Sequence, residues 1–445
     1  MTTEIPLLGH KGPDSVVAYR EGKAVSVVTF LADAAALAAS LPSHRHVVNL
    51  CADRYRFTVG LAAALMREQV SLLPPNEAPA TLEQLADEFP DLYCLHEGAP
   101  PAAKVATLPF PTELREGGVP FSSVPSFPSQ QQAMVLFTSG STGRPMPYPR
   151  LWGALVRGSH AAGKRLGIEA LAGATVIGTV PHQHSYGIES AVMLALQHGL
   201  AFESERPFYP ADVAACLAAA APPRILITTP IHLRAVLADD TALPKLDLVV
   251  SATAPLSPQL AAAAERRFQC PMLEIYGCSE AGQIAVRHPT ESEVWQCLET
   301  IALRQDEAGT WAFDEASGGD FLLNDVIELR GGGRFLLHGR TADLVNIAGK
   351  RTSLSHLNYH LNAIPGVTDG VFVMPEEEDG GTTRLIAFAV AAPGLSAQAI
   401  LAALRQRLDP AFLPRPLVLV DALPRNTLGK LPHDVIRRWA DAYGR

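Results

Sequence analysis

Apolar residues along this chain fall into two kinds of stretch, short continuous runs and longer segments with a helical repeat. Residues 29–40 and 57–68 are rich in Ala and Leu and predict helices. The short apolar runs have the length of buried strands, and those in the middle of the chain are each followed by a turn and a helical stretch. The predicted strands include residues 47–50, 134–137, 175–178, 225–228 and 246–250. This order of strand and helix predicts an α/β fold with mixed and parallel sheets flanked by helices.

The pattern changes near residue 340. A glycine cluster at residues 331–333 precedes a short predicted strand at 334–338, and a smaller α+β unit follows. That unit is expected to hold helices near 355–363 and 396–408 and strands near 370–375 and 384–391. We therefore expect a large N-terminal domain at residues 1–338 and a small C-terminal domain at residues 339–445.

The composition is that of a globular protein with a sizeable core. Of the 445 residues, 48% are hydrophobic and 18% are charged, which excludes a disordered chain. The net charge of −9 argues against a nucleic-acid binder, because such proteins usually carry a basic surface. None of the six cysteines forms a C-x-x-C pair, so reduced thiols are expected. No signal peptide and no membrane-spanning apolar run is visible, and we expect a cytoplasmic protein.

A loop of small residues follows the predicted strand at residues 134–137. Its glycines let the backbone approach an anion, and its amide and hydroxyl groups can surround phosphate oxygens. No G-K-[ST] follows, so the loop is not a P-loop. The alternative reading is a flexible surface turn. The loop consists of Thr138, Ser139, Gly140, Ser141, Thr142 and Gly143.

This loop resembles the signature T-S-G-[ST]-T-G-x-P-K of the adenylate-forming superfamily, which includes acyl- and aryl-CoA synthetases, nonribosomal adenylation domains and luciferases. The resemblance implies that the loop handles the β- and γ-phosphates of ATP. The final Lys of the signature is replaced by Met146. Arg144 and Arg150 are the candidates to supply the missing charge.

A second segment, residues 276–280, resembles the family motif Y-G-x-[ST]-E. The resemblance implies that Tyr276 stacks on adenine, that Ser279 bonds the α-phosphate and that Glu280 holds Mg²⁺ beside the phosphates. Gly277 and Cys278 complete the segment as ATP-site residues, and Gly277 also borders the acid pocket. Outside this order of motifs, Glu280 would be read as an ordinary surface carboxylate.

Residues 181–187, P-H-Q-H-S-Y-G, resemble the family's P-x-x-H-x-x-G segment. The resemblance implies that His184 lies near the carboxylate of the acid and that Tyr186 lines the acid pocket. His182 and His184 could instead be a metal pair, but no further ligand shows the required spacing. A packing role is the third reading, and we assign no catalytic role to His182.

Residues 251–256, S-A-T-A-P-L, resemble the family's G-G-A-P-L turn. The resemblance implies that Ala254 and Pro255 contact adenine and that Ala252 and Thr253 line the acid pocket. The turn lacks the two glycines of the family, which narrows the pocket. Without the other motifs it would be read as an ordinary turn between a strand and a helix.

The last motifs lie toward the C-terminus. Asp325 stands where the family has T-G-D, which implies that it accepts the ribose hydroxyls. Residues 339–351 resemble the interdomain motif, with Arg340 reaching the ribose, Ala342 at the hinge position and Gly349 beside the thiol-bearing arm. Residues 423–431, L-P-R-N-T-L-G-K-L, resemble the C-terminal motif, which makes Lys430 the catalytic lysine.

The resemblance implies a reaction in two steps that uses ATP and Mg²⁺. The acid attacks the α-phosphorus of ATP, the small mobile domain then rotates, and a phosphopantetheine thiol takes the acyl group. The short N-terminal portion and Trp152-Gly153 resemble compact ligases of bacterial aryl-polyene pigment clusters, which act on hydroxybenzoate-type acids and an acyl carrier protein. Free coenzyme A is the alternative acceptor. A non-catalytic nucleotide-binding relative and a luciferase-like oxygenase are the other hypotheses.

Overall fold

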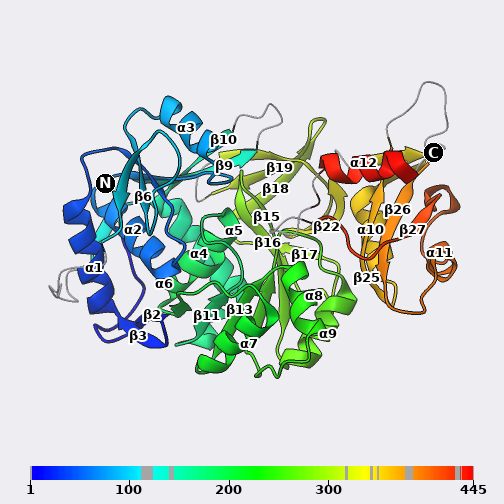
Figure 1. Ribbon diagram of the computed structural model, residues 1–445, viewed down its shortest axis with the longest axis horizontal. Helices are drawn as coiled ribbons and strands as arrows, with labels where there is room; N and C mark the ends of the chain where they lie inside the picture. Colours follow the sequence, from blue (N-terminus) through cyan, green and yellow to red (C-terminus); the bar gives the residue numbers. More distant parts are fainter. Residues whose placement is uncertain are drawn as a thin grey trace.

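The fold is seen in a computed structural model that describes residues 3–111, 124–139, 145–315, 319–340, 344–347, 350–375, 384–425, 431 and 433–443. Figure 1 shows the C-terminal elements, drawn in orange and red, gathered at one end of the molecule beyond the yellow strands. The N-terminal elements lie at the opposite end. Within the described ranges, no helix is long and apolar enough to cross a membrane.

The N-terminal part is built on a six-stranded sheet. Its strands are parallel apart from the edge strand β10, which pairs antiparallel with β9. In spatial order they are β10 (Pro145–Leu151), β9 (Gln132–Ser139), β5 (Val70–Leu73), β4 (His46–Asn49), β6 (Leu92–His96) and β7 (Ala106–Pro109). The N-terminal helices are α1 (Val27–Ser40), α2 (Arg54–Met66) and α3 (Pro79–Glu88). A short sheet pairs β1 (Glu4–Pro6) with β8 (Ser126–Pro128).

The central part is built on an eleven-stranded sheet that is parallel in its middle and antiparallel at both ends. In spatial order the strands are β21 (Asp325–Gly331), β22 (Arg334–Arg340), β17 (Trp295–Cys297), β16 (Gly282–Arg287), β15 (Met272–Cys278), β14 (Leu248–Ser251), β13 (Arg224–Thr228), β11 (Thr175–Gly178), β12 (Ala201–Glu203), β2 (Val16–Arg20) and β3 (Lys23–Ser26).

Helices join the parallel strands of this sheet, as the sequence predicts. Their starts are set by polar caps and prolines: Ser257 accepts from the backbone N–H of Leu260 at the start of α9, and Thr229 caps α8. The helices are α4 (Trp152–Leu166), α5 (Ser185–Gly187), the π-helix η3 (Ile188–Met193), α6 (Leu194–His198), α7 (Pro210–Ala219), α8 (Pro230–Ala238) and α9 (Pro258–Phe268). A 3₁₀ turn, η2 (Ile168–Leu171), follows α4.

Smaller sheets complete the structure. One is an antiparallel sheet of β18 (Ile301–Asp306), β19 (Gly309–Asp314) and β20 (Gly319–Leu323). Among its described residues, the C-terminal part has two sheets of its own, with three helices and a 3₁₀ turn. These elements are β23 (Leu344–Ile347), β24 (Lys350–Ser353), α10 (Leu354–Asn362), β25 (Val367–Val373), β26 (Ile386–Ala391), α11 (Ala397–Arg405), η5 (Pro410–Phe412), β27 (Leu417–Leu419) and α12 (His433–Tyr443).

The predicted fold class is confirmed, a mixed α/β protein with a large N-terminal and a small C-terminal domain. Two hydrophobic clusters of the C-terminal part draw their buried residues only from positions between Val345 and Ala440. Helices and strands expected beyond residue 340 are present as α10, β25, β26 and α11. Strand β22 runs to Arg340 and so crosses the expected division at residues 338/339, and the position of the domain boundary stays a prediction.

Candidate active site

The predicted phosphate loop connects an antiparallel strand pair. Ser139 at the end of β9 pairs with Pro145 at the start of β10, and Thr138 pairs with Met146. Residues 140–144, which hold Gly140, Ser141, Thr142 and Gly143, lie outside the described residues, as do the side chains of Thr138 and Ser139. The tertiary fold nevertheless places the ends of the loop at the carboxyl edge of the N-terminal sheet, where ligands of parallel sheets commonly bind.

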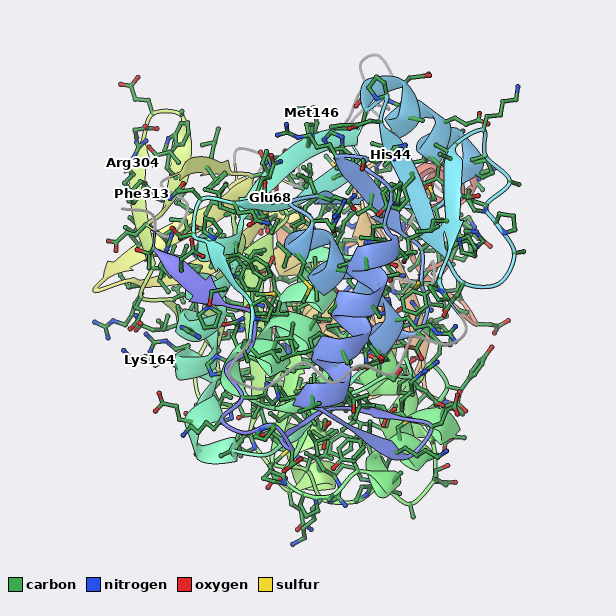
Figure 2. All side chains as sticks on the ribbon, turned by 90° about the vertical axis from the view of Figure 1, so that its left-hand side faces the viewer. His44, Glu68, Met146, Lys164, Arg304 and Phe313 are labelled. Atoms are coloured by element: carbon green, nitrogen blue, oxygen red, sulfur yellow. The ribbon has the colours of Figure 1, made fainter. Side chains whose placement is uncertain are left out.

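Met146, which replaces the family lysine, is half exposed at the surface of β10 (Figure 2). Arg150, one candidate to replace that lysine, is buried on the same strand. Its Nη2 donates to the backbone carbonyls of Ser279 and Glu280 at 2.6 and 2.8 Å. The guanidinium therefore holds the second motif, and Arg144, the other candidate, lies outside the described residues.

The second motif forms a β-hairpin. Strands β15 and β16 pair with Cys278 opposite Gly282, and residues 279–281 form the turn that presents Ser279 and Glu280. Gly277 is required here by close packing, because a Cβ on it would lie 2.4 Å from the carbonyl oxygen of Gly282. Burial, reinforced by the charge of Glu280, raises the pKa of the Cys278 thiol to about 12, so this cysteine stays a thiol.

Tyr276 lies deeper in the same hairpin. Its ring packs against Trp295 and Phe335, with centroid separations of 5.7 and 5.8 Å, and is largely buried. Its hydroxyl donates to Oδ2 of Asp325 at 2.7 Å. Asp325 on β21 lies opposite Arg340 on β22 in the register of the two strands. The three residues expected at adenine and ribose are thus brought together, although the side chain of Arg340 is not described.

A buried ion pair supports this region, and the sequence did not reveal it. Glu274 on β15 accepts from Nε of Arg287 on β16 at 2.6 Å and from the backbone N–H of Leu256 at 2.8 Å. Arg287 also donates to the carbonyl of Leu256 and stacks over Trp295 at 4.7 Å. The pair therefore ties the turn that contains Ala254 and Pro255 to the hairpin that contains Tyr276.

The predicted acid site lies where the turn 251–256 meets helix α5. The hydroxyl of Tyr186 donates to the carbonyls of Thr228 and Val250, at 3.1 Å in each case. Enclosure raises the pKa of this phenol well above its ordinary value, so it remains a neutral donor. Ala252 is buried beside this contact, and Thr253 is exposed with a φ of +77°. The structure thus places Tyr186 against β14, the strand that leads into the turn with Ala252 and Thr253.

His182 has a packing role. Its Nε2 bonds the carbonyl of Cys51 at 2.9 Å, and its ring packs on Phe57 at 4.6 Å. Burial lowers its pKa to about 3, so the ring is neutral. The described residues contain no group of three or more His, Cys, Asp or Glu side chains that could hold a metal.

A cavity of about 560 Å³ lies beside His184, between that segment and the carboxyl ends of β4 and β5. Its polar lining includes Asn49, Asn76, Glu77, Gln183 and Arg206. The first 130 residues match none of the family motifs, so those motifs did not predict the N-terminal side of this cavity. A sequence signal for this side of the cavity exists, because Asn49 and Asn76 come at or just after the ends of two parallel strands, where ligands commonly bind.

Glu280 is the described residue suited to Mg²⁺. It offers carboxylate oxygens, the ligand that Mg²⁺ prefers, at the tip of the β15–β16 hairpin. Mg²⁺ is commonly held by one or two carboxylates together with substrate phosphates, so a single protein carboxylate fits a Mg²⁺ that binds with ATP. A metal held by the protein alone would need more ligands, and the described side chains supply none in a cluster.

The C-terminal motif residues are only partly described. Ala342, Gly349 and Lys430 lie outside the described residues. Arg425, which directly precedes the segment that holds Lys430, donates to both carboxylate oxygens of Asp369, at 2.6 and 2.8 Å. Arg234, on helix α8 of the large domain, lies 3.5 Å from the same carboxylate. Asp369 thus joins the chain before Lys430 to both domains.

Comparison with known proteins agrees with this arrangement. A family model described as AMP-binding enzyme matches residues 10–304. The chain is 31% identical over 308 residues to 4-coumarate–CoA ligase of Rhodobacter capsulatus, covering 68% of this chain and 75% of that one. It is 32% identical over 131 residues to the salicylyl-CoA synthase / salicylate adenylyltransferase of a Streptomyces species, covering 28% and 24%. ATP-bound MatB from Rhodopseudomonas palustris has the same fold, with a TM-score of 0.80 at 19% identity over 97% of both chains.

Proposed function

The chain belongs to the AMP-binding enzyme family as an adenylate-forming acid ligase, and from this premise we propose that it activates a hydroxybenzoate-like aromatic acid with ATP and loads it onto an acyl carrier protein. The observation that carries the ATP half of this proposal is the bond between Tyr276 and Asp325, which lies in one sheet with Arg340 and beside the hairpin of Glu280. Residues at the expected nucleotide positions are thus gathered around one hairpin.

In the first step, a carboxylate oxygen of the acid forms a bond to the α-phosphorus of ATP, and the bond from that phosphorus to pyrophosphate breaks. Two anions must approach each other, so positive charge and donors have to meet them. Lys430 supplies the ammonium, the loop 138–143 holds the β- and γ-phosphates, and Ser279 bonds the α-phosphate. Glu280 would hold Mg²⁺, which would supply charge neutralisation at the phosphates.

In the second step, the sulfur of a phosphopantetheine thiol forms a bond to the acyl carbon, the bond to AMP breaks, and the thiol proton is released. The small domain, residues 339–445, acts as a lid that carries Lys430 away and brings Gly349 beside the thiol-bearing arm. His184 is assigned to the acyl group in both steps. It lines the cavity of about 560 Å³, and it lies two residues before Tyr186 of the proposed acid site.

An aromatic acid is supported by the relatives and by the residues of the acid site. The two curated relatives are named for coumarate and salicylate, which are both hydroxylated aromatic acids. The acid site has Ala252 and Thr253 in place of the two family glycines, and Tyr186 is fixed by two carbonyls. A narrow pocket with a rigid wall favours a flat ring over a flexible chain. Because both relatives are named for CoA chemistry, free coenzyme A is the second candidate acceptor.

The experiment that tests the proposal is acid-dependent exchange of labelled pyrophosphate into ATP across a panel of aromatic and aliphatic acids. Exchange with hydroxybenzoates, followed by mass detection of an acylated carrier protein, is the expected result. Exchange with aliphatic acids alone contradicts the aromatic assignment. If none of the acids in the panel supports exchange, the result favours a non-catalytic nucleotide binder. Thioester on coenzyme A without acylated carrier assigns the acceptor to coenzyme A.

A lysine variant separates the two steps. Lys430→Ala is expected to abolish exchange and to spare thioester formation from a supplied acyl-adenylate, because the ammonium serves only the first step. Equal loss in both half-reactions contradicts this division. Lys164→Ala is the matched control, since Lys164 on α4 pairs with Glu299 and has no proposed role in either step.

A further inference from the structure

Arg150 reaches from the strand after the phosphate loop to the turn that presents Glu280. One terminal nitrogen of its guanidinium donates to two successive carbonyls, those of Ser279 and Glu280. These carbonyls belong to the hairpin turn at residues 279–281, which joins β15 to β16. A charged donor forms stronger hydrogen bonds than a neutral one, so this contact fixes the turn firmly.

A partly buried carboxylate contacts the same hairpin just after the turn. Glu189 accepts from the hydroxyl of Ser185 at 2.6 Å and from the backbone N–H of Gln283 at 3.1 Å. A Cβ on Gly282 would lie 3.2 Å from that carboxylate, so the carboxylate packs directly on the end of the turn. Burial raises the pKa of Glu189, and the Ser185 bond and the nearby charge of Arg150 oppose that rise. Arg150 on β10 thus bonds the turn itself, and Glu189 on η3 bonds the first residues of β16 that follow it.

The space around these side chains is small. A cavity of about 40 Å³ is lined by Arg150, Glu189, Gln283 and Asp314, which is room for no more than a few water molecules. Arg150 is 7% exposed. A buried guanidinium that is already bonded to two carbonyls is placed to hold the backbone. This role differs from contact with the β- and γ-phosphates, which the resemblance implies for the loop whose lysine is replaced by Met146.

We propose that Arg150 is a positioning residue that fixes the 279–281 turn so that the carboxylate of Glu280 meets the magnesium complex of ATP. This inference rests on the proposed function and deepens it. It also assigns Arg150 a role that does not require contact with the phosphates. Glu189 assists by holding Gln283, and the pair links the acid-site helix to the ATP-site hairpin.

The test is calorimetric binding of ATP, once with MgCl₂ and once in EDTA, to the full-length protein. The quantity compared is the ratio of the two dissociation constants, because only the magnesium complex depends on the position of Glu280. In Arg150→Gln the advantage of magnesium is expected to fall about 10-fold, the usual effect of removing a group that orients a metal ligand. In Arg150→Lys the charge is kept and the loss is expected to be about threefold.

Arg267→Met is the matched control. Arg267 on α9 also donates to two backbone carbonyls, those of Thr241 and Leu243, away from the hairpin, and its loss should leave the ratio unchanged. A folded Arg150→Gln variant with the wild-type ratio overturns the proposal, and so does equal weakening of both binding constants, which signals a merely structural role. Should Arg150→Gln fail to fold, an unchanged ratio in Arg150→Lys overturns it instead. If the wild-type protein binds magnesium-ATP but none of the acids supports pyrophosphate exchange, the proposed function is overturned and the role of Arg150 is not.

Discussion

Tyr276 Oη donates a 2.7 Å hydrogen bond to Oδ2 of Asp325 and so joins two strands that are not neighbours in the large sheet. Tyr276 lies on β15 and Asp325 opens β21, and β16, β17 and β22 lie between them in the sheet order. Trp295 and Phe335 fill the space beneath the bond, stacked at 6.3 Å with an interplanar angle of 11°. The bond fixes the orientation of the carboxylate that is proposed to accept the ribose hydroxyls.

Tyr276→Phe removes this bond and keeps the ring. We expect the KM for ATP to rise about threefold to 10-fold while kcat changes less, because the variant loses orientation of a binding group. The free energy of unfolding should fall by about 1 kcal/mol. Pyrophosphate exchange against ATP concentration and urea unfolding give the two values. Tyr93→Phe, which removes a tyrosine bond to Gln69 within the N-terminal part, is the control and should leave the KM unchanged.

The buried ring of His182 should make the stability of the folded protein depend on pH. The pKa of its buried ring is lowered to about 3, so between about pH 3 and 6.5 the unfolded state binds more protons than the folded state. Stability from this group is therefore complete above pH 6.5 and is lost as the pH falls. The loss at pH 5 is on the order of 2 kcal/mol. Urea unfolding of wild type and His182→Gln at pH 7 and pH 5 should show a smaller decrease in the variant. Equal decreases would show that His182 is not protonated on unfolding.

A side chain at Gly187 should cause a steric clash beside the proposed acid site. A Cβ at this position would lie 1.9 Å from the carbonyl oxygen of Pro181, and backbone cannot yield as a side chain can. Gly187→Ala should therefore lower the free energy of unfolding by about 1–3 kcal/mol and displace Tyr186 from its two carbonyl partners. Gly158→Ala on helix α4 is the control, because its Cβ meets open space, and it should be neutral or stabilising by up to about 1 kcal/mol. Similar destabilisation in both would contradict the steric explanation.

Asp369 links the two domains to the chain that leads to Lys430, the proposed catalytic lysine. Asp369→Asn weakens the paired bonds from Arg425, so the segment that begins at residue 426 and holds Lys430 loses its anchor. The rate of pyrophosphate exchange should fall about 10-fold, the value of a lost hydrogen bond to a charged group. Arg234→Met removes only the 3.5 Å contact from the large domain and should cost less than about threefold. A larger effect in Arg234→Met would mean that the domain contact matters more than the anchor.

Much of the architecture was readable from local pattern. The apolar runs at 175–178, 225–228 and 246–250 are β11, β13 and β14, because buried parallel strands need continuous apolar residues. The antiparallel strands after β15 were less visible. The strands β18 to β20 carry exposed and buried residues together and lie near the surface, so their apolar signal is weak.

The sequence by itself determined the family, the mixed α/β class and the order of the motifs along the chain, because the order and spacing of motifs are properties of the sequence. It also located the ends of the phosphate loop at a strand terminus. It could not show that Arg150 holds carbonyls 129 and 130 positions away, that Glu274 and Arg287 form a buried pair, or that Asn49, Glu77 and Arg206 share a cavity. These relationships join residues that are remote along the chain, and only the packing of the strands and helices around them decides which polar groups meet.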